Sequence, residues 1–279
     1  MKKLIIVSVT LLLLVGISCK GKNNNQQEDS TESDPLAVSV VGEEVTYATD
    51  STDLKGYLAY DENKKDKRPG VVIVHEWWGH NDYVRKRADM LAEIGYTAIA
   101  VDMYGNGKQA AHPEDAGKFA KSVFSNLPEA KARFSAAVDV LKNHNSVNTE
   151  KIAAIGYCFG GSVVLTMANS GVDLDAVAAF HSGVTLPEMP NDKLKARVLV
   201  CNGADDPFIG EAAIEKFKSA MDSIGANYEY ISYPGAKHGF TSKEADKKGE
   251  KFNLPLAYNA QADKQSWIKL QELLSEVFE

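Results

Sequence analysis

The sequence predicts an α/β domain, built on a mostly parallel, twisted sheet of about eight strands with helices on both faces. Two observations lead to this prediction. Short apolar runs such as "GVVIVHE" and "YTAIAVD", typical of strands buried on both faces, alternate with amphipathic stretches long enough for helices. In addition, residues 37–279 show no break in composition and no internal repeat, so they fit a single domain.

The first half of this domain should begin with strands. The segments "VSVVGEEVTYAT" and "LKGYLAY" indicate an opening hairpin, and "GVVIVHE" is the next strand. Residues 82–95 predict a helix that stops at Gly95, because their apolar side chains fall on one stripe: Val84, Ala88, Leu91 and Ala92. The strand "YTAIAVD" and a second amphipathic helix follow. The stripe of this second helix comprises Ala130, Phe134, Ala137, Val138 and Leu141.

The second half continues the alternation. The strand "KIAAIGY" leads into a helix from Phe159, and the strands "AVAAFHS" and "ARVLVCN" come next. A helix over residues 212–224 precedes the strand "NYEYISY". The segment "SKEADKKGEK" mixes both signs of charge and predicts a solvated loop at the rim. The chain closes with a helix that carries Trp267, Leu270, Leu274 and Val277.

The N-terminus has the pattern of an export signal. Lys2 and Lys3 precede the apolar stretch from Leu4 to Ile17, and small residues follow in "GISCK". A basic start, a short apolar core and a small-residue cleavage site describe a secretory signal over residues 1–18, too short for a membrane span. The protein is therefore expected to be exported to the bacterial cell envelope or periplasm.

Cys19 resembles the lipidated cysteine of a bacterial lipobox and would become the mature N-terminus. Gly16 departs from the strict pattern, so plain secretion with a spare thiol remains the alternative. Residues 19–36 predict a flexible tether, because after Cys19 this stretch has no hydrophobic residue until Leu36. The membrane contact expected here is through this lipid anchor alone.

The charge and the histidine positions limit the partners. The formal net charge is −7, and loss of the two signal-segment lysines would take it to −9. Such acidity argues against nucleic acid as a partner. No cofactor is predicted. No metal is predicted either, because five of the histidines fall on separate elements: His75, His80, His112, His144 and His181.

The segment "GYCFGG", residues 156–161, has the form of a nucleophile elbow. It joins a strand pattern to a helix pattern as G-x-Nuc-x-G, with Cys158 in the central position. The glycines are needed because the central residue is strained and the flanking chains approach too closely for Cβ atoms. Glycine-rich turns also occur in nucleotide-binding folds, but G-x-G-x-x-G is not met here. Cys158 is therefore a candidate nucleophile.

Two later loops supply an acid and a base in the chain order that such a nucleophile requires. "NGADDPFIG" and "PGAKHGF" each follow a strand, at the sheet edge where open α/β sheets bind ligands. His238 is the predicted general base and Asp206 the acid that orients it. Asp205 is the rival acid, and Asp206 is preferred because it directly precedes Pro207.

The oxyanion of an acyl-transfer intermediate needs two donors, for which the backbone amides of Phe159 and Trp77 are predicted. Five aromatic side chains lie at or near strand ends and could line an apolar cleft for a neutral ester, lactone or thioester. We expect Trp77 and Tyr104 to line it, with the others less clearly assigned: Trp78, Phe208 and Phe240.

These motifs resemble the dienelactone hydrolase family, the carboxymethylenebutenolidases. The resemblance extends from about Val71 to Phe278 and is carried by "HEWWG", "YTAIAVDMYG", "IGYCFGG", "GADDPF" and "AKHGF". It implies an α/β-hydrolase fold and a role for Glu76, whose carboxylate would share a proton with the resting thiol and move away when substrate binds. One departure concerns the substrate. The arginines that hold a substrate carboxylate in this family have no counterpart here, where Lys108 and Lys243 are the nearby cations.

The sequence therefore predicts a cysteine-nucleophile hydrolase of small esters, lactones or thioesters, working through an acyl-enzyme on Cys158. Two alternatives stay open at this point. One is a non-catalytic, hydrolase-like lipoprotein that binds a small molecule, and the other is a thiol-dependent transferase or redox function at the same cysteine.

Overall fold

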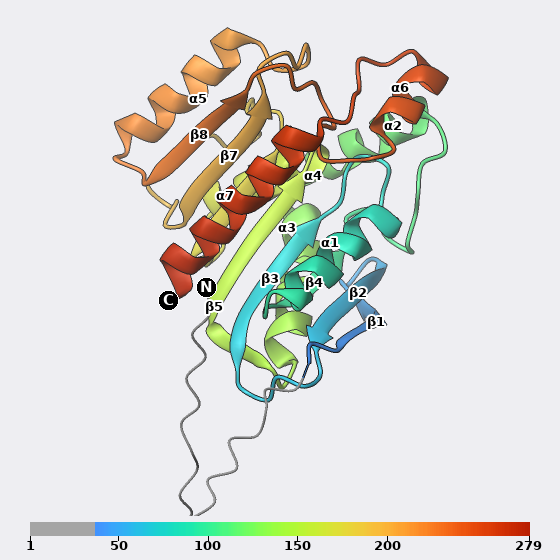
Figure 1. Cartoon of the computed structure of the whole chain (residues 1–279), viewed down its shortest axis with the longest axis vertical. Coiled ribbons are helices and arrows are strands. Elements are labelled where there is room, and N and C mark those ends of the chain that lie inside the picture. Colours follow the sequence, from blue (N-terminus) through green and yellow to red (C-terminus); the bar gives the residue numbers. More distant parts are fainter. Residues whose placement is uncertain (1–36) are drawn as a thin grey trace, which may run out of the picture. The chain divides into compact units, whose positions relative to one another are not determined.

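The computed structural model of the chain describes residues 37–279 (Figure 1). The predicted signal segment, the tether and Cys19 lie outside the described residues. The strands are β1 (Val40–Ala48), β2 (Asp53–Asp61), β3 (Arg68–Val74), β4 (Thr97–Val101), β5 (Val147–Tyr157), β6 (Ala176–Phe180), β7 (Arg197–Gly203) and β8 (Tyr228–Tyr233). The helices are α1 (Asp82–Glu93), α2 (Pro113–Phe124), α3 (Leu127–Asn143), α4 (Phe159–Asn169), α5 (Glu211–Ser223), α6 (Ala245–Phe252) and α7 (Ala260–Phe278). Within residues 37–279, no helix is both long and apolar enough to cross a membrane.

The eight strands form one sheet in the order β1-β2-β4-β3-β5-β6-β7-β8. The predicted hairpin of β1 and β2 is confirmed, and β2 pairs antiparallel with β4. All strands from β4 through β3 to β8 pair in parallel, so the predicted mostly parallel sheet is confirmed. Because parallel strands end at the same edge, the loops that follow β3, β5, β7 and β8 all begin on one side of the molecule.

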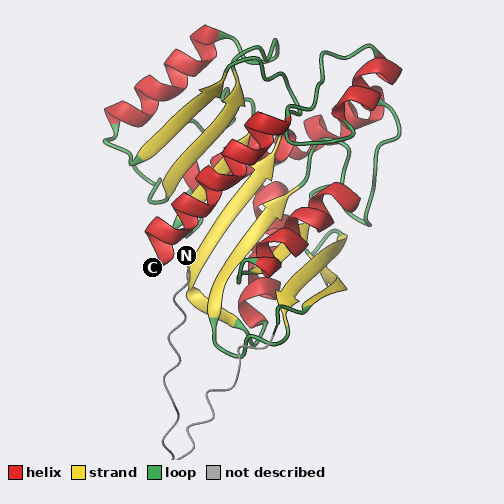
Figure 2. Cartoon of the chain, in the orientation of Figure 1, coloured by secondary structure: helices red, strands yellow, loops and turns green. Residues whose placement is uncertain are grey.

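Helices cover both faces of the sheet, as predicted (Figures 1 and 2). One core lies under α3, α4 and α5, and the other lies under α1 and α7. Strand β3 serves both cores: Val72 and Val74 belong to the first, whereas Val71 and Ile73 belong to the second. This alternation follows from the two-residue period of a strand. Since both faces of a strand are buried in this way, the sequences of the buried strands are unbroken apolar runs.

The prediction of a solvated loop over "SKEADKKGEK" is wrong, because most of this segment forms α6. The helix presents a narrow face of small and aliphatic groups, on which Ala245 and Gly249 are buried. Asp246, Lys247, Glu250 and Lys251 are charged and exposed, and these charges hid the helical period in the composition. The helix ends at Asn253 in the left-handed conformation, with φ of 50°. Helix α2 was also not predicted from the sequence.

The turn between β5 and α4 has the backbone geometry of the predicted elbow. Cys158 has a φ of 56° and a ψ of −118°, a conformation that L-residues seldom adopt. A Cβ atom at position 156 would lie 2.1 Å from the Gly160 carbonyl oxygen. One at position 160 would lie 2.3 Å from the carbonyl oxygen of Val74. Glycine is therefore required at both flanking positions by contact with backbone atoms.

We expect Gly160→Ala to destabilise the fold by roughly 1–3 kcal/mol, because its methyl group would overlap the backbone of β3. Gly117→Ala is the matched control. It adds the same methyl group inside α2, where nothing lies within 4 Å, and should stabilise by about 0.5–1 kcal/mol. Thermal and urea unfolding of both variants measure the difference. Equal effects of the two substitutions would contradict this account of the elbow.

Candidate active site

Cys158 lies at the carboxyl end of β5, where it caps the N-terminus of α4. Its N–H donates to the carbonyl oxygen of Phe180 at 2.9 Å, which ties the elbow to the end of β6. The side chain is partly exposed, in contrast to the fully buried Cys201. The elbow thus presents the sulfur at the sheet edge, next to the first turn of a helix.

The loops after β7 and β8 bring an acid and an imidazole to this sulfur. His238 Nε2 lies 3.0 Å from Cys158 Sγ, and His238 Nδ1 lies 2.8 Å from Asp206 Oδ2. The other oxygen of Asp206 accepts the backbone N–H of Phe208 at 2.9 Å, which fixes the carboxylate. Asp206 is buried, whereas the rival Asp205 is exposed. The structure therefore brings together the three side chains preferred from the sequence.

The residues around His238 favour the protonated form of its imidazole. Burial alone would lower the pKa of His238, but the adjoining Cys158 sulfur and the Asp206 carboxylate raise it to about 10. Around neutral pH the imidazole is thus favoured in its protonated form. It then donates to the carboxylate from one nitrogen and to the sulfur from the other.

Glu76 lies beside the sulfur in a small cavity. The cavity measures about 10 Å³, and its lining includes Glu76, Trp77, Cys158, His238 and Lys248. The side chain is only 6% exposed, and burial raises the pKa of its carboxyl group although Lys248 and His238 oppose the rise. The hydrogen-bond partner of the thiol is His238, and within residues 37–279 no hydrogen bond joins Glu76 to the sulfur.

The backbone N–H groups of the two predicted oxyanion donors have no hydrogen-bond acceptor in the described part of the chain. Phe159 is the first residue of α4, where a backbone N–H has no partner inside the helix. The backbone N–H of Trp77 donates to no acceptor within residues 37–279. Trp77 also lines the cavity at the sulfur. Both amides are therefore available to a ligand at Cys158.

The five aromatic residues predicted to shape the cleft do not all do so. Trp77 and Trp78 line the small cavity. Phe208 is 55% exposed and sets its ring edge-on to His238. Tyr104 is buried against Phe159, and its hydroxyl donates to the Trp77 carbonyl oxygen at 2.9 Å, so it supports the loop. The prediction for Phe240 is wrong, because this side chain is fully buried in the core under α7.

Sequence reasoning missed the part of the site that comes from α6 and its flanking segments. Ser242, Ala245, Lys248 and Leu256 line the small cavity, and Lys248 Nζ lies 4.5 Å from the Trp78 ring centre. The positions of Ala245, Lys248, Gly249 and Phe252 follow a helical period, which was the one available signal. Lys108 and Lys243, the cations considered in place of the family's arginines, do not line this cavity.

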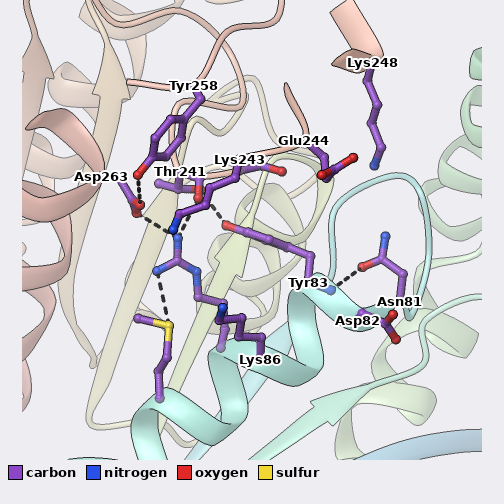
Figure 3. A pocket seen from close by; sticks show the side chains of 13 residues that line it. Asn81, Asp82, Tyr83, Lys86, Thr241, Lys243, Glu244, Lys248, Tyr258 and Asp263 are labelled. Carbon is purple, nitrogen blue, oxygen red and sulfur yellow. Dashed lines mark hydrogen bonds and ion pairs between the residues drawn. The ribbon is translucent and has the colours of Figure 1, made fainter. Parts of the chain in front are cut away.

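A larger cavity of about 580 Å³ adjoins the small one, with which it shares Ser242 and Lys248. It lies between α1 and the segment from Thr241 to Lys248, and Figure 3 shows Tyr83 and Lys86 reaching toward it from α1. Its size is typical of small-molecule sites. Among the described residues, no group of three or more His, Cys, Asp or Glu side chains is arranged to hold a metal ion.

Because burial raises the pKa of Glu76, its protonated form is favoured in the folded protein relative to the unfolded chain. Glu76→Gln should therefore match the wild type in stability at pH 4 and exceed it as the pH rises to 8. The expected gain is about 1.4 kcal/mol for each unit by which the pKa is raised. Urea unfolding at both pH values measures it, and Glu150→Gln on the exposed part of β5 is the control. A gain that does not depend on pH would contradict the assignment.

Comparisons with known proteins identify the family of the chain. Residues 54–278 match the sequence model of the dienelactone hydrolase family. "Protein usf" of Aquifex pyrophilus is 27% identical over 211 residues, which cover 74% of this chain and 90% of that protein. The solved structure m3DLH has a TM-score of 0.82 at 35% identity and covers 86% of this chain and 99% of its own. A dienelactone hydrolase-like promiscuous phosphotriesterase from metagenomic libraries, P91, has a TM-score of 0.80 at 32% identity, with the same coverage. The chain, whose described residues form an eight-stranded sheet with a cysteine elbow, belongs to the dienelactone hydrolase family.

Proposed function

We propose that this hydrolase cleaves small esters, lactones or thioesters through an acyl-enzyme on Cys158. The observation that supports the proposal most is the continuous line of contacts from Asp206 through His238 to the sulfur. The raised pKa of His238 adds to it, because an imidazolium next to the sulfur stabilises the thiolate. The alternative of a non-catalytic binding protein is not favoured by membership of this family.

In the first half of the reaction, the thiolate of Cys158 attacks the carbonyl carbon of the substrate. The carbonyl oxygen becomes an oxyanion, which the backbone N–H groups of Phe159 and Trp77 are placed to bind. As the tetrahedral intermediate collapses, the bond to the leaving group breaks. His238 donates its Nε2 proton to the departing oxygen or sulfur, which leaves a thioester on Cys158 and a neutral imidazole.

In the second half, a water molecule takes the place of the leaving group. His238 removes one proton from the water while its oxygen attacks the thioester carbonyl. The second tetrahedral intermediate expels the Cys158 thiolate and releases the carboxylic acid. The imidazolium–thiolate pair is then restored, and Asp206 has kept the imidazole oriented throughout.

Glu76 bears on the kind of substrate that this site accepts. Its carboxylate shares the small cavity with the sulfur, so any charge it carries repels an anionic group next to the scissile carbonyl. Among the described residues that line this cavity, Lys248 is the one lysine or arginine. Burial lowers the pKa of Lys248, which disfavours its charged form. We therefore infer a substrate that is neutral around the reacting bond.

Asp206→Asn should lower kcat for short aryl esters by roughly 10²–10⁴-fold, because the amide no longer stabilises the imidazolium or holds its tautomer. Asp205→Asn is the matched control, since it makes the same change one residue away on an exposed side chain. It should leave kcat within about twofold. Steady-state kinetics of both variants measure the difference.

The thiol is tested in the same assay. Cys158→Ala, or alkylation of the wild type with iodoacetamide, should abolish turnover, whereas the buried Cys201→Ser should retain it. The proposal fails if the wild type turns over none of a panel of esters, lactones and thioesters. It also fails if the Cys158→Ala variant remains active.

We further propose that the protein is exported and held in the cell envelope through a lipid on Cys19. The support is the signal pattern of residues 1–18 and the polar segment that follows. Expressed with its own signal in a bacterial host, the wild type should be found in the membrane fraction with added lipid mass on Cys19. The Cys19→Ser variant should lose both. An unmodified, soluble wild-type protein would contradict the proposal.

A further inference from the structure

His181 is a buried residue next to the proposed active site that the mechanism does not use. It directly follows β6, and its side chain is fully buried. Its φ of 38° is unusual for a residue with a side chain, and such backbone strain tends to occur at functional sites. Its Nδ1 is buried without a hydrogen-bond partner within residues 37–279. Neither feature would be expected of a residue that only fills space.

The ring of His181 contacts the ring of His238 edge to face. Their centres are 5.3 Å apart, and the angle between the ring planes is 71°. The two hydrogen bonds of His238 hold it on the line between Asp206 and Cys158 but restrain rotation about that line only weakly. Ring contacts must supply the rest. Phe208 also packs edge-on against His238, but it is 55% exposed, so the buried His181 is the firmer support.

His181 is itself anchored by a chain of hydrogen bonds that leads to another element. Its Nε2 lies 2.7 Å from Thr241 Oγ1, which lies 2.6 Å from the hydroxyl of Tyr83 on α1. Figure 3 shows the link between Tyr83 and Thr241 at the wall of the larger cavity. The carbonyl oxygen of Thr241 also accepts from Arg87 at 2.8 Å, and Arg87 pairs with Asp263. Thr241 is therefore held from two sides.

The charges around His181 keep it neutral. Burial, together with the neighbouring His238 and Arg87, holds its pKa well below the usual value. A second imidazolium would repel the protonated His238, so a neutral ring is suited to a supporting role. Phe240 and Tyr157 pack on the same ring and carry no charge at neutral pH.

We propose that His181, anchored through Thr241 to Tyr83, is a positioning residue that holds the imidazole of His238 in line with Cys158. The inference rests on the proposed function. It goes further by assigning a role to three residues: His181 directly after β6, Thr241 in the loop after β8, and Tyr83 on α1. The hydroxyl of Thr241 is the central link, because its loss frees the ring of His181 from its anchor.

Thr241→Val tests the link, since it keeps the shape and removes the hydroxyl. We expect kcat for aryl esters to fall about tenfold or more while KM changes by less than about twofold, because the substrate still binds but the base is misplaced. Alkylation of Cys158 by iodoacetamide at pH 7 should slow by about threefold or more, because the imidazole stabilises the thiolate less well. Thr241→Ser, which keeps a hydroxyl, should restore both rates.

Thr97→Val is the matched control. Thr97 is also fully buried, and its hydroxyl contacts Arg68 and Ser146 at the opposite edge of the sheet. This variant should lose stability with no change in kcat or in the alkylation rate. Cys201 does not interfere with the alkylation readout, because burial raises the pKa of its thiol to about 12.

The proposal is overturned if Thr241→Val keeps both rates, or if Thr241→Ser fails to restore them. If Thr241→Val does not fold, Tyr83→Phe decides, since it removes only the outer link. Slower alkylation in that variant supports the proposal, and an unchanged rate overturns it. If the wild type hydrolyses nothing, the proposed function fails, but the alkylation rates still decide whether His181 positions His238.

Discussion

The close crossing of backbone at Gly156 and Gly160 is the constraint on which the rest of the site depends. The first turn of α4 lies against the end of β5 and the carbonyl groups of β3, with no room for a Cβ atom at either glycine. This crossing forces Cys158 into its strained conformation and projects the sulfur over the sheet edge. The same turn leaves the N–H of Phe159 without a partner inside the helix, so nucleophile and oxyanion donor are set by one piece of backbone.

Ionisable side chains line a cavity too small to hold more than about one water molecule. Because so little water solvates them, their pKa values depend mainly on burial and on one another. A carboxylate on one side and a sulfur on the other hold the imidazole of His238 in its charged form despite burial. Glu76 faces the same sulfur, and burial favours its neutral form. A neutral Glu76 leaves the positive charge of the imidazolium to Asp206 and the sulfur.

Support for the reacting groups comes from segments that are distant along the chain. Helix α6 encloses the small cavity through Ala245 and Lys248, and Tyr83 on α1 reaches His181 through Thr241. The second of these contacts anchors His181, whose ring packs on the imidazole of His238. A site assembled on loops at the sheet edge gains rigidity in this way, because the helices that cover the sheet also hold the loops.

The sequence by itself determined the features that are local in the chain. Apolar runs gave the parallel strands, the G-x-C-x-G pattern gave the elbow, and an acid and a histidine after two later strands gave the partners of Cys158. These inferences succeed because parallel strands end at one edge, so order along the chain implies nearness in space. Only the tertiary structure decided that Phe240 is core and that Lys248 and His181 adjoin the site. The physical reason is that burial and contact between distant segments depend on packing, which no local pattern records.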